Sequence, residues 1–534
     1  MLMKLGFLSV SLFFSILIQA QNLYQKVIGG VSDDKTYGAL QTRDKGFILG
    51  GYSYSQAMGG CDMYLVKTDS TGKVQWGETF GGPKDDEGYA VRQTADDGFI
   101  FCGYTKSFGS GGYDVYLIRT KPNGDTLWTK TYGGALDEFG NAIQITADGG
   151  YIIGGYTSSF SYNKDSGNAY MLKLDPNGNL QWSKTFSGPS QITDVYDIVQ
   201  TPDHGYAMTG YSNAFGEPNG DAFLAKTDSM GNLQFIKTYG FKGYDWGTSL
   251  IQTADGGFMI GGTYSTDSTS LDLDVYLLKT NPTGDTTFTR TYGGKGSEFG
   301  QCIRQVTGGN YILGGYTNSF GAGAYDACVM KFNNSGDTLF SRLYGGPLDD
   351  EANCVMQCTD GSIALAGLVN SFGAGAADVY LVKMEPGDTD CNTNSFPALR
   401  RHSSSKVGTY IATATSTATL TTNTKTIVHT VIQGSVICNT TGIAPITSSD
   451  PSLFLFPNPG KGVFRVRFEN PEAGDYSIGI HDILGKNLLS IACKSNSKQE
   501  EQDIDLSAFS SGVYFVEVKG ENFRHAVKMV LEKE

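Results

Sequence analysis

One stretch of the chain decides its fold: from Gly81 to Tyr132 it reads GGPKDDEGYAVRQTADDGFIFCGYTKSFGSGGYDVYLIRTKPNGDTLWTKTY. It holds four strand-like runs, at residues 89–94, 99–105, 114–120 and 126–132, separated by segments rich in Gly, Asn and Asp. These residues supply the positive φ that tight hairpin turns need. The stretch therefore predicts four antiparallel strands, named A to D in chain order.

The same unit occurs seven times. Its opening Gly-Gly pair, or the residues in that place, begins at Gly29, Gly81, Gly133, Ser187, Gly240, Gly293 and Gly345, at steps of 52 to 54 residues. The seventh unit has no strand D, but residues 23–30 (LYQKVIGG) match residues 127–134 (LWTKTYGG). We therefore expect an all-β fold in which residues 21–390 form a seven-bladed β-propeller, closed by an N-terminal strand that completes the last blade.

The start of the chain indicates export. Residues 1–20 carry one early positive charge at Lys4, then an apolar run, and end in Ala20, which places signal cleavage before Gln21. No later stretch is long and apolar enough for a transmembrane segment. A net charge of −14 disfavours nucleic acid as a partner, because phosphate binding needs a basic surface.

Residues 391–450 differ in composition from the repeats. From Cys391 to Ser449 there is no Asp or Glu, and 14 of the 59 residues are Thr. Three interpretations are open: a linker, a small hairpin of residues 413–419 and 427–437, or a β spacer that holds the propeller away from the cell surface. The nine cysteines of the chain form no disulfide framework and no CxxC metal pair. Cys391 and Cys438, which flank this segment, are the candidate disulfide.

Carboxylates recur on one predicted face of the propeller. In a four-stranded blade the D–A and B–C connections emerge on one face, and the A–B and C–D turns on the other. The D–A connections carry Asp34, Asp86, Glu138, Asp245, Glu298 and Asp350 at one offset, with Asp194 nearby in the fourth repeat. The B–C connections end in Asp62, Asp114, Asp221, Asp274, Asp326 and Asp378, with Asn168 in the third repeat. These side chains are predicted to converge around the mouth of the channel.

Two interpretations of these acids are open. They form a cation site, with Ca²⁺ as the candidate ion, or a surface for a basic or hydroxyl-rich ligand, because hard cations prefer clustered oxygens. Alternatively each acid accepts backbone N–H bonds from its own loop and is repeated because the blade is repeated. No metal ligand set and no cofactor is otherwise indicated.

Signals for catalysis are weak. The five histidines are scattered, and neither an HExxH nor a GxSxG motif occurs. The turn from Asp69 to Trp76 resembles the blade motif of quinoprotein dehydrogenases, but the resemblance covers the turn and its aromatic residue alone and implies no cofactor. We expect a non-catalytic module that binds an extracellular glycan or protein. The alternatives are a carbohydrate-active hydrolase or lyase, since paired acids support glycoside cleavage, and a structural surface component.

Residues 451–534 carry an ordered set of short motifs. They are Phe456-Pro457-Asn458-Pro459 with Gly462, His481-Asp482 with Gly485, Gly512-Val513-Tyr514, and Val527-Lys528. In this order they resemble the type A C-terminal sorting domain of the Bacteroidetes type IX secretion system. The resemblance implies entry into the periplasm, recognition of the domain by the secretion machinery, its removal, and release or surface attachment of the rest. Alternating residues around 464–468, 477–481 and 514–518 predict a small β-sandwich.

Overall fold

The structure is a computed structural model, and its described residues form strands and turns but no helix. It describes residues 23–57, 59–161, 167–187, 192–215, 219–240, 243–265, 273–374, 376–385, 399–401, 406–410, 413–416, 420–423, 427–430, 435–439, 453–456, 463–469, 475–482, 487–494, 499–509, 512–519 and 524–531. Within these residues no helix has the length and hydrophobicity to cross a bilayer. The predicted signal peptide with its cut between Ala20 and Gln21 lies outside them, as does the predicted Cys391–Cys438 disulfide.

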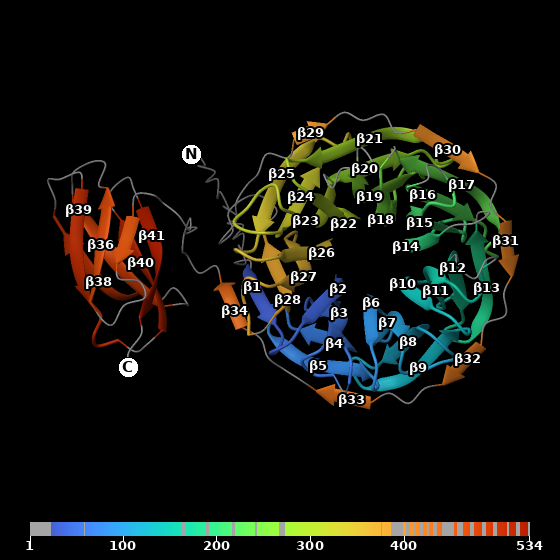
Figure 1. Cartoon of the computed structure of the whole chain (residues 1–534), viewed down its shortest axis with the longest axis horizontal. Coiled ribbons are helices and arrows are strands. Elements are labelled where there is room, and N and C mark those ends of the chain that lie inside the picture. Colours follow the sequence, from blue (N-terminus) through green and yellow to red (C-terminus); the bar gives the residue numbers. More distant parts are fainter. Residues whose placement is uncertain are drawn as a thin grey trace, which may run out of the picture.

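Seven antiparallel sheets form a ring around a central axis, which confirms the seven-bladed propeller (Figure 1). Strand A is innermost in each blade. The A strands of blades 1 to 7 are β2 (Asp34–Gln41), β6 (Asp86–Gln93), β10 (Glu138–Ile145), β14 (Thr193–Gln200), β18 (Asp245–Gln252), β22 (Glu298–Gln305) and β26 (Asp350–Gln357). The B strands are β3 (Phe47–Ser53), β7 (Phe99–Thr105), β11 (Tyr151–Thr157), β15 (Tyr206–Ser212), β19 (Phe258–Ser265), β23 (Tyr311–Thr317) and β27 (Ile363–Val369).

Strands C and D complete each sheet toward the rim. The C strands are β4 (Asp62–Thr68), β8 (Asp114–Thr120), β12 (Asn168–Leu174), β16 (Asp221–Thr227), β20 (Leu273–Thr280), β24 (Asp326–Phe332) and β28 (Asp378–Met384). The D strands are β5 (Val74–Gly81), β9 (Thr126–Gly133), β13 (Leu180–Ser187), β17 (Leu233–Gly240), β21 (Thr286–Gly293), β25 (Thr338–Tyr344) and β1 (Tyr24–Ile28). Every strand runs between two faces, here named the loop face (D–A and B–C connections) and the turn face (A–B and C–D turns).

Strand A starts three residues earlier than its sequence pattern suggests, at Asp86 rather than Tyr89 in blade 2. The reason is a β-bulge at the fourth residue, seen as a register shift between Gly88 and Ala90 opposite β7. A bulge breaks the strict alternation on which the prediction rested. The second and fourth residues of each A strand are part-exposed, while the first and third are buried.

The N-terminal strand closes the ring, as predicted. β1 pairs in register with β28 from Tyr24 opposite Lys383 to Ile28 opposite Val379. Tyr24, Val27 and Ile28 are each exposed by 3% or less and belong to the core of the closing blades. Burying three such side chains contributes about 2 kcal/mol each, so β1 stabilises the closed ring strongly.

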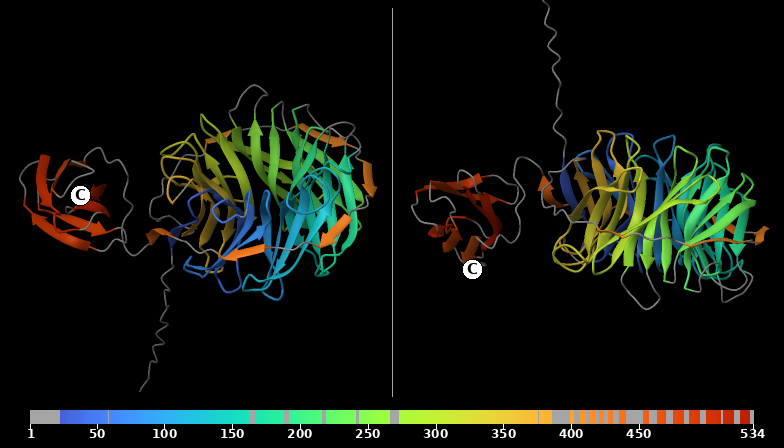
Figure 2. Two further views of the ribbon diagram at one scale, coloured as in Figure 1. Left: turned by 60° about the horizontal axis from the view of Figure 1, so that its bottom comes forward. Right: turned by 90° about the horizontal axis from the view of Figure 1, so that it is seen from above.

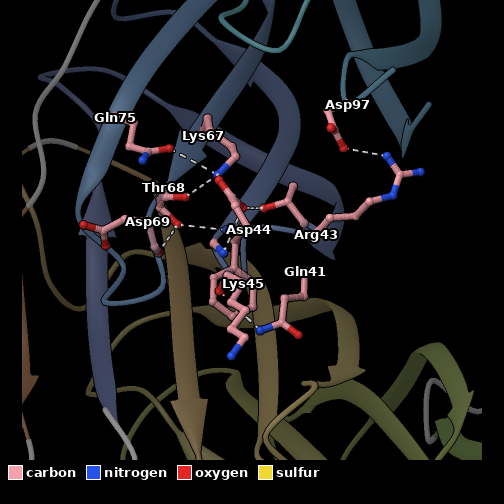
Figure 3. Close-up of polar contacts among 12 residues, drawn as sticks. Gln41, Arg43, Asp44, Lys45, Lys67, Thr68, Asp69, Gln75 and Asp97 are labelled. Carbon is pink, nitrogen blue, oxygen red and sulfur yellow. Dashed lines mark hydrogen bonds and ion pairs between the residues drawn. The ribbon is translucent and has the colours of Figure 1, made fainter. Parts of the chain in front are cut away.

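On the turn face, a repeated ion pair joins strand C to the A–B turn. In blade 1, Lys67 is buried and its Nζ lies 2.7 Å from Asp44 of the turn (Figure 3). The same ammonium donates to the Thr68 carbonyl, which anchors it on its own strand. The pair recurs as Arg119–Asp96, Lys173–Asp148, Lys226–Asp203, Lys279–Asp255 and Lys383–Asp360. These charges therefore have a structural role within six of the seven blades.

Six short strands form a belt on the outer rim of the propeller (Figures 1 and 2). They are β29 (Leu399–Arg401), β30 (Lys406–Tyr410), β31 (Thr413–Ser416), β32 (Leu420–Asn423), β33 (Ile427–Thr430) and β34 (Ser435–Asn439). Each adds a fifth strand to one blade by pairing with β21, β17, β13, β9, β5 and β1, respectively. The belt therefore passes the blades in the order 5, 4, 3, 2, 1 and 7, opposite to the order of the repeats.

The belt decides among the interpretations of the Thr-rich segment. The hairpin of residues 413–419 and 427–437 is wrong, because the strands in these ranges pair with three different blades and not with each other. The physical reason is the open edge of each D strand, whose N–H and C=O groups need partners. Thr, Val and Ile favour the extended conformation that such an edge accepts. A role as a spacer from the cell surface stays a prediction.

The C-terminal unit is a small β-sandwich, as expected. One sheet contains β35 (Leu453–Phe456), β36 (Val463–Glu469) and β39 (Gln499–Asp505). The other contains β38 (Asn487–Cys493), β37 (Tyr476–Asp482), β40 (Gly512–Lys519) and β41 (Arg524–Leu531). Their inner faces share one apolar core, in which Phe464 and Ile504 of the first sheet join Ile478 and Val516 of the second.

The closure by β1 predicts a position-specific loss of stability. Val27→Asp places a carboxylate where the native side chain is 3% exposed, whereas Val31→Asp does so where it is 80% exposed. Because an unpaired buried charge is costly, the first variant should melt roughly 5–10 °C below the parent and the second within about 1 °C of it. Differential scanning fluorimetry measures both. Equal melting temperatures for the two variants would contradict closure by β1.

Pairing with the belt should protect particular backbone amides of the D strands from hydrogen exchange. The double variant Val436→Pro/Ile437→Pro removes N–H donors from β34, so amides of β1 that face β34 should exchange at least about 10-fold faster. The matched control Thr421→Pro/Thr422→Pro in β32 should instead expose amides of β9 and leave β1 unchanged. Hydrogen–deuterium exchange resolved by peptide reads both. Unchanged exchange of β1 and β9 in both variants would argue against the belt.

Candidate functional site

The predicted acids of the loop face lie at the junctions between blades. In the second junction, Asp114 at the start of β8 and Glu138 at the start of β10 approach the same glycine, Gly133, from two sides. A Cβ on Gly133 would lie 1.9 Å from Asp114 Oδ1 and 2.7 Å from Glu138 Oε2. Only glycine leaves room for both carboxylates. The other such junctions are Asp378–Gly29–Asp34, Asp62–Gly81–Asp86, Asp221–Gly240–Asp245, Asp274–Gly293–Glu298 and Asp326–Gly345–Asp350.

These junction acids, two for each glycine, are buried and bonded to their own loops. All twelve are exposed by 4% or less. Asp86 is representative: its Oδ2 accepts the Gly82 N–H at 2.8 Å and the Ser107 hydroxyl at 2.7 Å, and its Oδ1 accepts the Thr105 hydroxyl. Glu138 and Asp350 accept equivalent bonds from the D–A and B–C connections of their blades. Asp86, Glu138 and Asp350 thus each tie the D–A connection before their strand to the B–C connection of their blade.

The structure brings the predicted acids together in pairs at the junctions between blades. Among the described residues, no three His, Cys, Asp or Glu side chains form a group suited to a metal ion. Two carboxylates at each junction also fall short of the six to eight oxygens that Ca²⁺ takes. Calcium binding on this face stays a prediction, to be tested by melting chelated protein with and without Ca²⁺.

At the junction of blades 3 and 4 the glycine and both of its acids are replaced together. There Ser187 takes the place of the glycine, and Asn168 and Thr193 take the places of the two acids. The Thr193 hydroxyl lies 2.9 Å from that of Ser212, so a neutral hydrogen bond replaces the carboxylate contacts. Asp194, which the sequence suggested as the fourth acid, instead occupies the second position of β14. Its carboxylate accepts from the Asn141 amide at 2.9 Å.

Burial raises the pKa of five of the junction acids. For Asp114 the pKa is about 6, because burial penalises the charge and Glu138 and Asp137 repel it, while the Ser110 N–H partly compensates. Asp326 also has a pKa of about 6, from burial and from Asp350 beside it. Burial likewise raises the pKa of Asp34, Asp86 and Asp350. These carboxyls therefore have the electrostatics of packed structural groups.

A second set of residues on the loop face differs from blade to blade. These residues occupy the second position of each A strand, next to the axis. Together with the aromatic side chains that contact them, they are here named the channel mouth. From blade 1 to blade 7 the residues are Lys35, Glu87, Phe139, Asp194, Trp246, Phe299 and Glu351, all part-exposed. A residue that serves only the blade fold would recur in each repeat. The variation at this position therefore favours the mouth as the candidate site.

Aromatic rings form a continuous band across blades 1 to 3 of the mouth. In order they are Tyr52, Tyr37, Tyr89, Tyr104, Phe139 and Tyr156, with successive ring centroids 5.9, 4.9, 5.5, 4.7 and 5.7 Å apart. On blades 4 and 5, Trp246 lies between Tyr211 and Tyr244, and it is stacked on Tyr244 at an interplanar angle of 9°. On blade 6, Phe299, Tyr316 and Tyr325 contact one another.

Charged groups interrupt the aromatic surface. Glu87 accepts the Tyr89 hydroxyl at 3.0 Å, which places a carboxylate inside the band. Burial raises the pKa of Glu351, although Lys35 opposes this. Burial also raises the pKa of Asp194 to about 7, against the opposing hydrogen bond from Asn141. The mouth is thus an apolar, ring-lined surface with a few acidic groups, a composition typical of small-molecule sites.

Sequence reasoning placed the site on this face but missed the aromatic band. Its members come from the second and fourth residues of strand A and the sixth of strand B, and the bulge in strand A obscures that spacing. A column-by-column comparison of the repeats would have found them, because the variable positions stand out against the constant ones.

The predicted motif residues of the C-terminal unit lie partly within the described residues. Asp482 ends β37, Gly512 begins β40, and Tyr514 is buried in the sandwich core. Lys528 lies in β41 and pairs with Phe515. Pro457, Asn458, Pro459, Gly462 and Gly485 lie outside the described residues.

Comparison with known families identifies this C-terminal unit. Residues 454–532 match the family described as the secretion system C-terminal sorting domain. The protein is therefore a cargo of the type IX secretion system. It passes through the periplasm and is released or attached at the outer cell surface, with the sorting domain as its contact to the secretion machinery.

Several solved structures are similar to this chain at low identity. They include Sqt1 from Chaetomium thermophilum, with TM-score 0.38 and 10% identity over 69% of this chain and 100% of that one. A protein of unknown function from Dyadobacter fermentans has the same TM-score and identity over 68% and 98% of the two chains. An α-L-arabinanase from Penicillium chrysogenum, complexed with arabinobiose, has TM-score 0.33 and 9% identity over 68% and 98%. No curated protein matches the sequence.

The junction acids predict a pH-dependent gain of stability on neutralisation. In the folded state Asp114 has a pKa of about 6, whereas about 3.9 is usual for an unfolded chain. Ionisation of the buried Asp114 carboxyl lowers the free energy of unfolding, an effect that is absent below pH 4 and complete above pH 6. Stability therefore falls as the pH rises through this window. Asp114→Asn, which copies Asn168 of blade 3, should add about 2 kcal/mol at pH 7.5 and almost nothing at pH 4.

Two further variants control for this effect. Asp326→Asn should behave like Asp114→Asn, because its pKa is also about 6. Asp148→Asn should do the opposite and lose stability at pH 7.5, because Lys173 and the Thr146 hydroxyl hold the pKa of Asp148 at about 2. Urea unfolding at the two pH values measures all three. A loss of stability at pH 7.5 in both junction variants would show that these acids stabilise the ring when ionised.

Proposed function

We propose that the exported propeller is a non-catalytic binding protein that takes a hydroxyl-rich extracellular ligand, such as a polysaccharide, at the channel mouth of its loop face. The observation that carries the proposal is the band of six aromatic rings across blades 1 to 3. Flat aromatic rings offer a large apolar contact area at low conformational cost, and Tyr hydroxyls add hydrogen bonds at the same surface.

Charge and rigidity support the same proposal. The rings lie on A and B strands held in place by the ring of blades, so little entropy is lost when a ligand binds. Glu87 within the band and Glu351 beside Lys35 supply acceptors for ligand hydroxyls. The exported location places the mouth in contact with extracellular polymers. A neutral or basic polymer fits this surface better than a polyanion, because the chain as a whole has a net charge of −14.

A carbohydrate-active hydrolase is the second candidate, and one observation favours it. Asp194 lies at the mouth with a pKa of about 7, so at neutral pH a large fraction of it is protonated. A carboxyl in that state is suited to protonate a glycosidic oxygen, as a general acid does. The ionised partner that such a reaction needs would be Glu87 or Glu351 of the same face.

A panel of polysaccharides, scored for retention of the protein and for release of reducing ends, tests both candidates. Tyr89→Ala should weaken retention at least 10-fold, because it removes the ring at the centre of the band and exposes Tyr37 and Tyr104 at their edges. The matched control Phe340→Ala, in strand D at the rim, should leave retention unchanged. Retention lost equally in both variants, or in neither, would contradict a site at the mouth.

Release of reducing ends distinguishes the second candidate. If the protein is a binder, release stays at background for the parent and for Asp194→Asn. If it is a hydrolase, the parent releases reducing ends and Asp194→Asn loses that activity while still being retained. Absence of both retention and release over the whole panel would leave a structural surface role.

A further inference from the structure

Two consecutive blades carry cysteine at the same place near the axis. Cys302 is the fifth residue of β22 and Cys354 the fifth residue of β26, so one repeat of 52 residues separates them. Their sulfur atoms lie 3.8 Å apart, and each residue is 4% exposed. The other A strands have Gly38, Ala90, Ala142, Asp197 and Ser249 at this position. The two thiols therefore face each other across the junction of blades 6 and 7.

The surroundings orient the pair and favour its reactivity. Cys302 Sγ accepts the Val355 N–H at 3.3 Å, which aims it at blade 7, and donates to Cys354 Sγ. That hydrogen bond and the nearby Arg304 guanidinium lower the pKa of Cys354 to about 6, although burial opposes the shift. A thiolate is the form of cysteine that attacks a disulfide. In the folded protein Cys354 is thus the member of the pair that ionises more readily.

We propose that Cys302 and Cys354 form a disulfide in the exported protein, joining blade 6 to blade 7 next to the axis. The sulfurs are in contact at 3.8 Å and need to approach to about 2.05 Å for the bond to form. The type IX route supplies the conditions, because it leads through the periplasm, where disulfides form and persist.

The oxidant is a protein disulfide of a thiol–disulfide oxidoreductase. One of the two cysteines, as its thiolate, attacks one sulfur of that disulfide, and the other sulfur leaves as a thiolate. The second cysteine then loses its proton and attacks the sulfur of the first, which frees the oxidoreductase in its dithiol form. Two electrons and two protons pass from the cysteine pair to the oxidant. Because the pair is buried in the closed ring, the exchange takes place while blades 6 and 7 are still open to solvent.

The bond would fix the blade that the N-terminal strand has to complete. Blade 7 contains β26, β27 and β28 and receives β1 as its fourth strand. A covalent link between β22 and β26 holds this three-stranded sheet against blade 6 before β1 arrives. It also removes conformations of the 51 residues between the two cysteines from the unfolded chain, so oxidised protein should melt at a higher temperature than reduced protein.

Mass spectrometry of the full-length protein tests the proposal directly. Protein recovered from the medium or cell surface without reductant is denatured, alkylated with iodoacetamide and digested. We expect a peptide pair linked through Cys302 and Cys354, with both cysteines free of alkyl groups. The same chain made in the cytoplasm without its first 20 residues serves as the reduced reference. Alkylated Cys302 and Cys354 in the exported protein would overturn the proposal, and this readout needs no variant to fold.

A melting experiment adds a second readout. Dithiothreitol should lower the melting temperature of the exported parent by about 5 °C or more and leave Cys302→Ser and Cys354→Ser unchanged. Cys328→Ala, a buried thiol of blade 6 outside the pair, serves as the matched control and should keep the sensitivity of the parent. A dithiothreitol effect that persists in Cys302→Ser would place the responsible disulfide elsewhere and contradict the proposal.

Discussion

The contact on which the propeller depends is a glycine held between two buried carboxylates. It occurs at six junctions between blades, where the acid that starts strand C of one blade and the acid that starts strand A of the next meet at the glycine after strand D. Each acid binds its own connecting loops, so this one contact sets the spacing of the blades and the conformation of the loop face. The contact lowers stability electrostatically, because it buries two carboxylates side by side. The raised pKa values of Asp114 and Asp326 are the consequence.

Much of the fold could be predicted because the same strand pattern recurs in every repeat and can be compared from one repeat to the next. The 52-residue period and the match of residues 23–30 to residues 127–134 led to seven blades and to the closing strand. The belt could not be predicted, since threonine alternation indicates a strand but not its partner. Its strands begin at 399, 406, 413, 420 and 427, a step of seven residues that has meaning only once the outer strands of the blades are in place.

The candidate site was harder to predict, because constant and variable residues carry different information. Asp34, Asp86 and their equivalents attracted attention by recurring, yet recurrence is what a packing role produces. The mouth residues Glu87, Asp194 and Trp246 share one structural position and differ in chemistry, which is what a ligand would select. The spacing of Cys302 and Cys354 equals one repeat, which indicates equivalent positions in neighbouring blades. Only the structure shows that their sulfur atoms are in contact.

The belt also determines how mechanical tension would pass through the molecule. β34 is the belt strand closest in sequence to the C-terminal sandwich, so a pull from that end reaches it first and the remaining strands in turn, from β33 to β29. Each belt strand would detach as a unit of three to five residues. The first strand pair to separate is β34 with β1. A force applied at the C-terminus would therefore act first on β1, the strand that closes the ring.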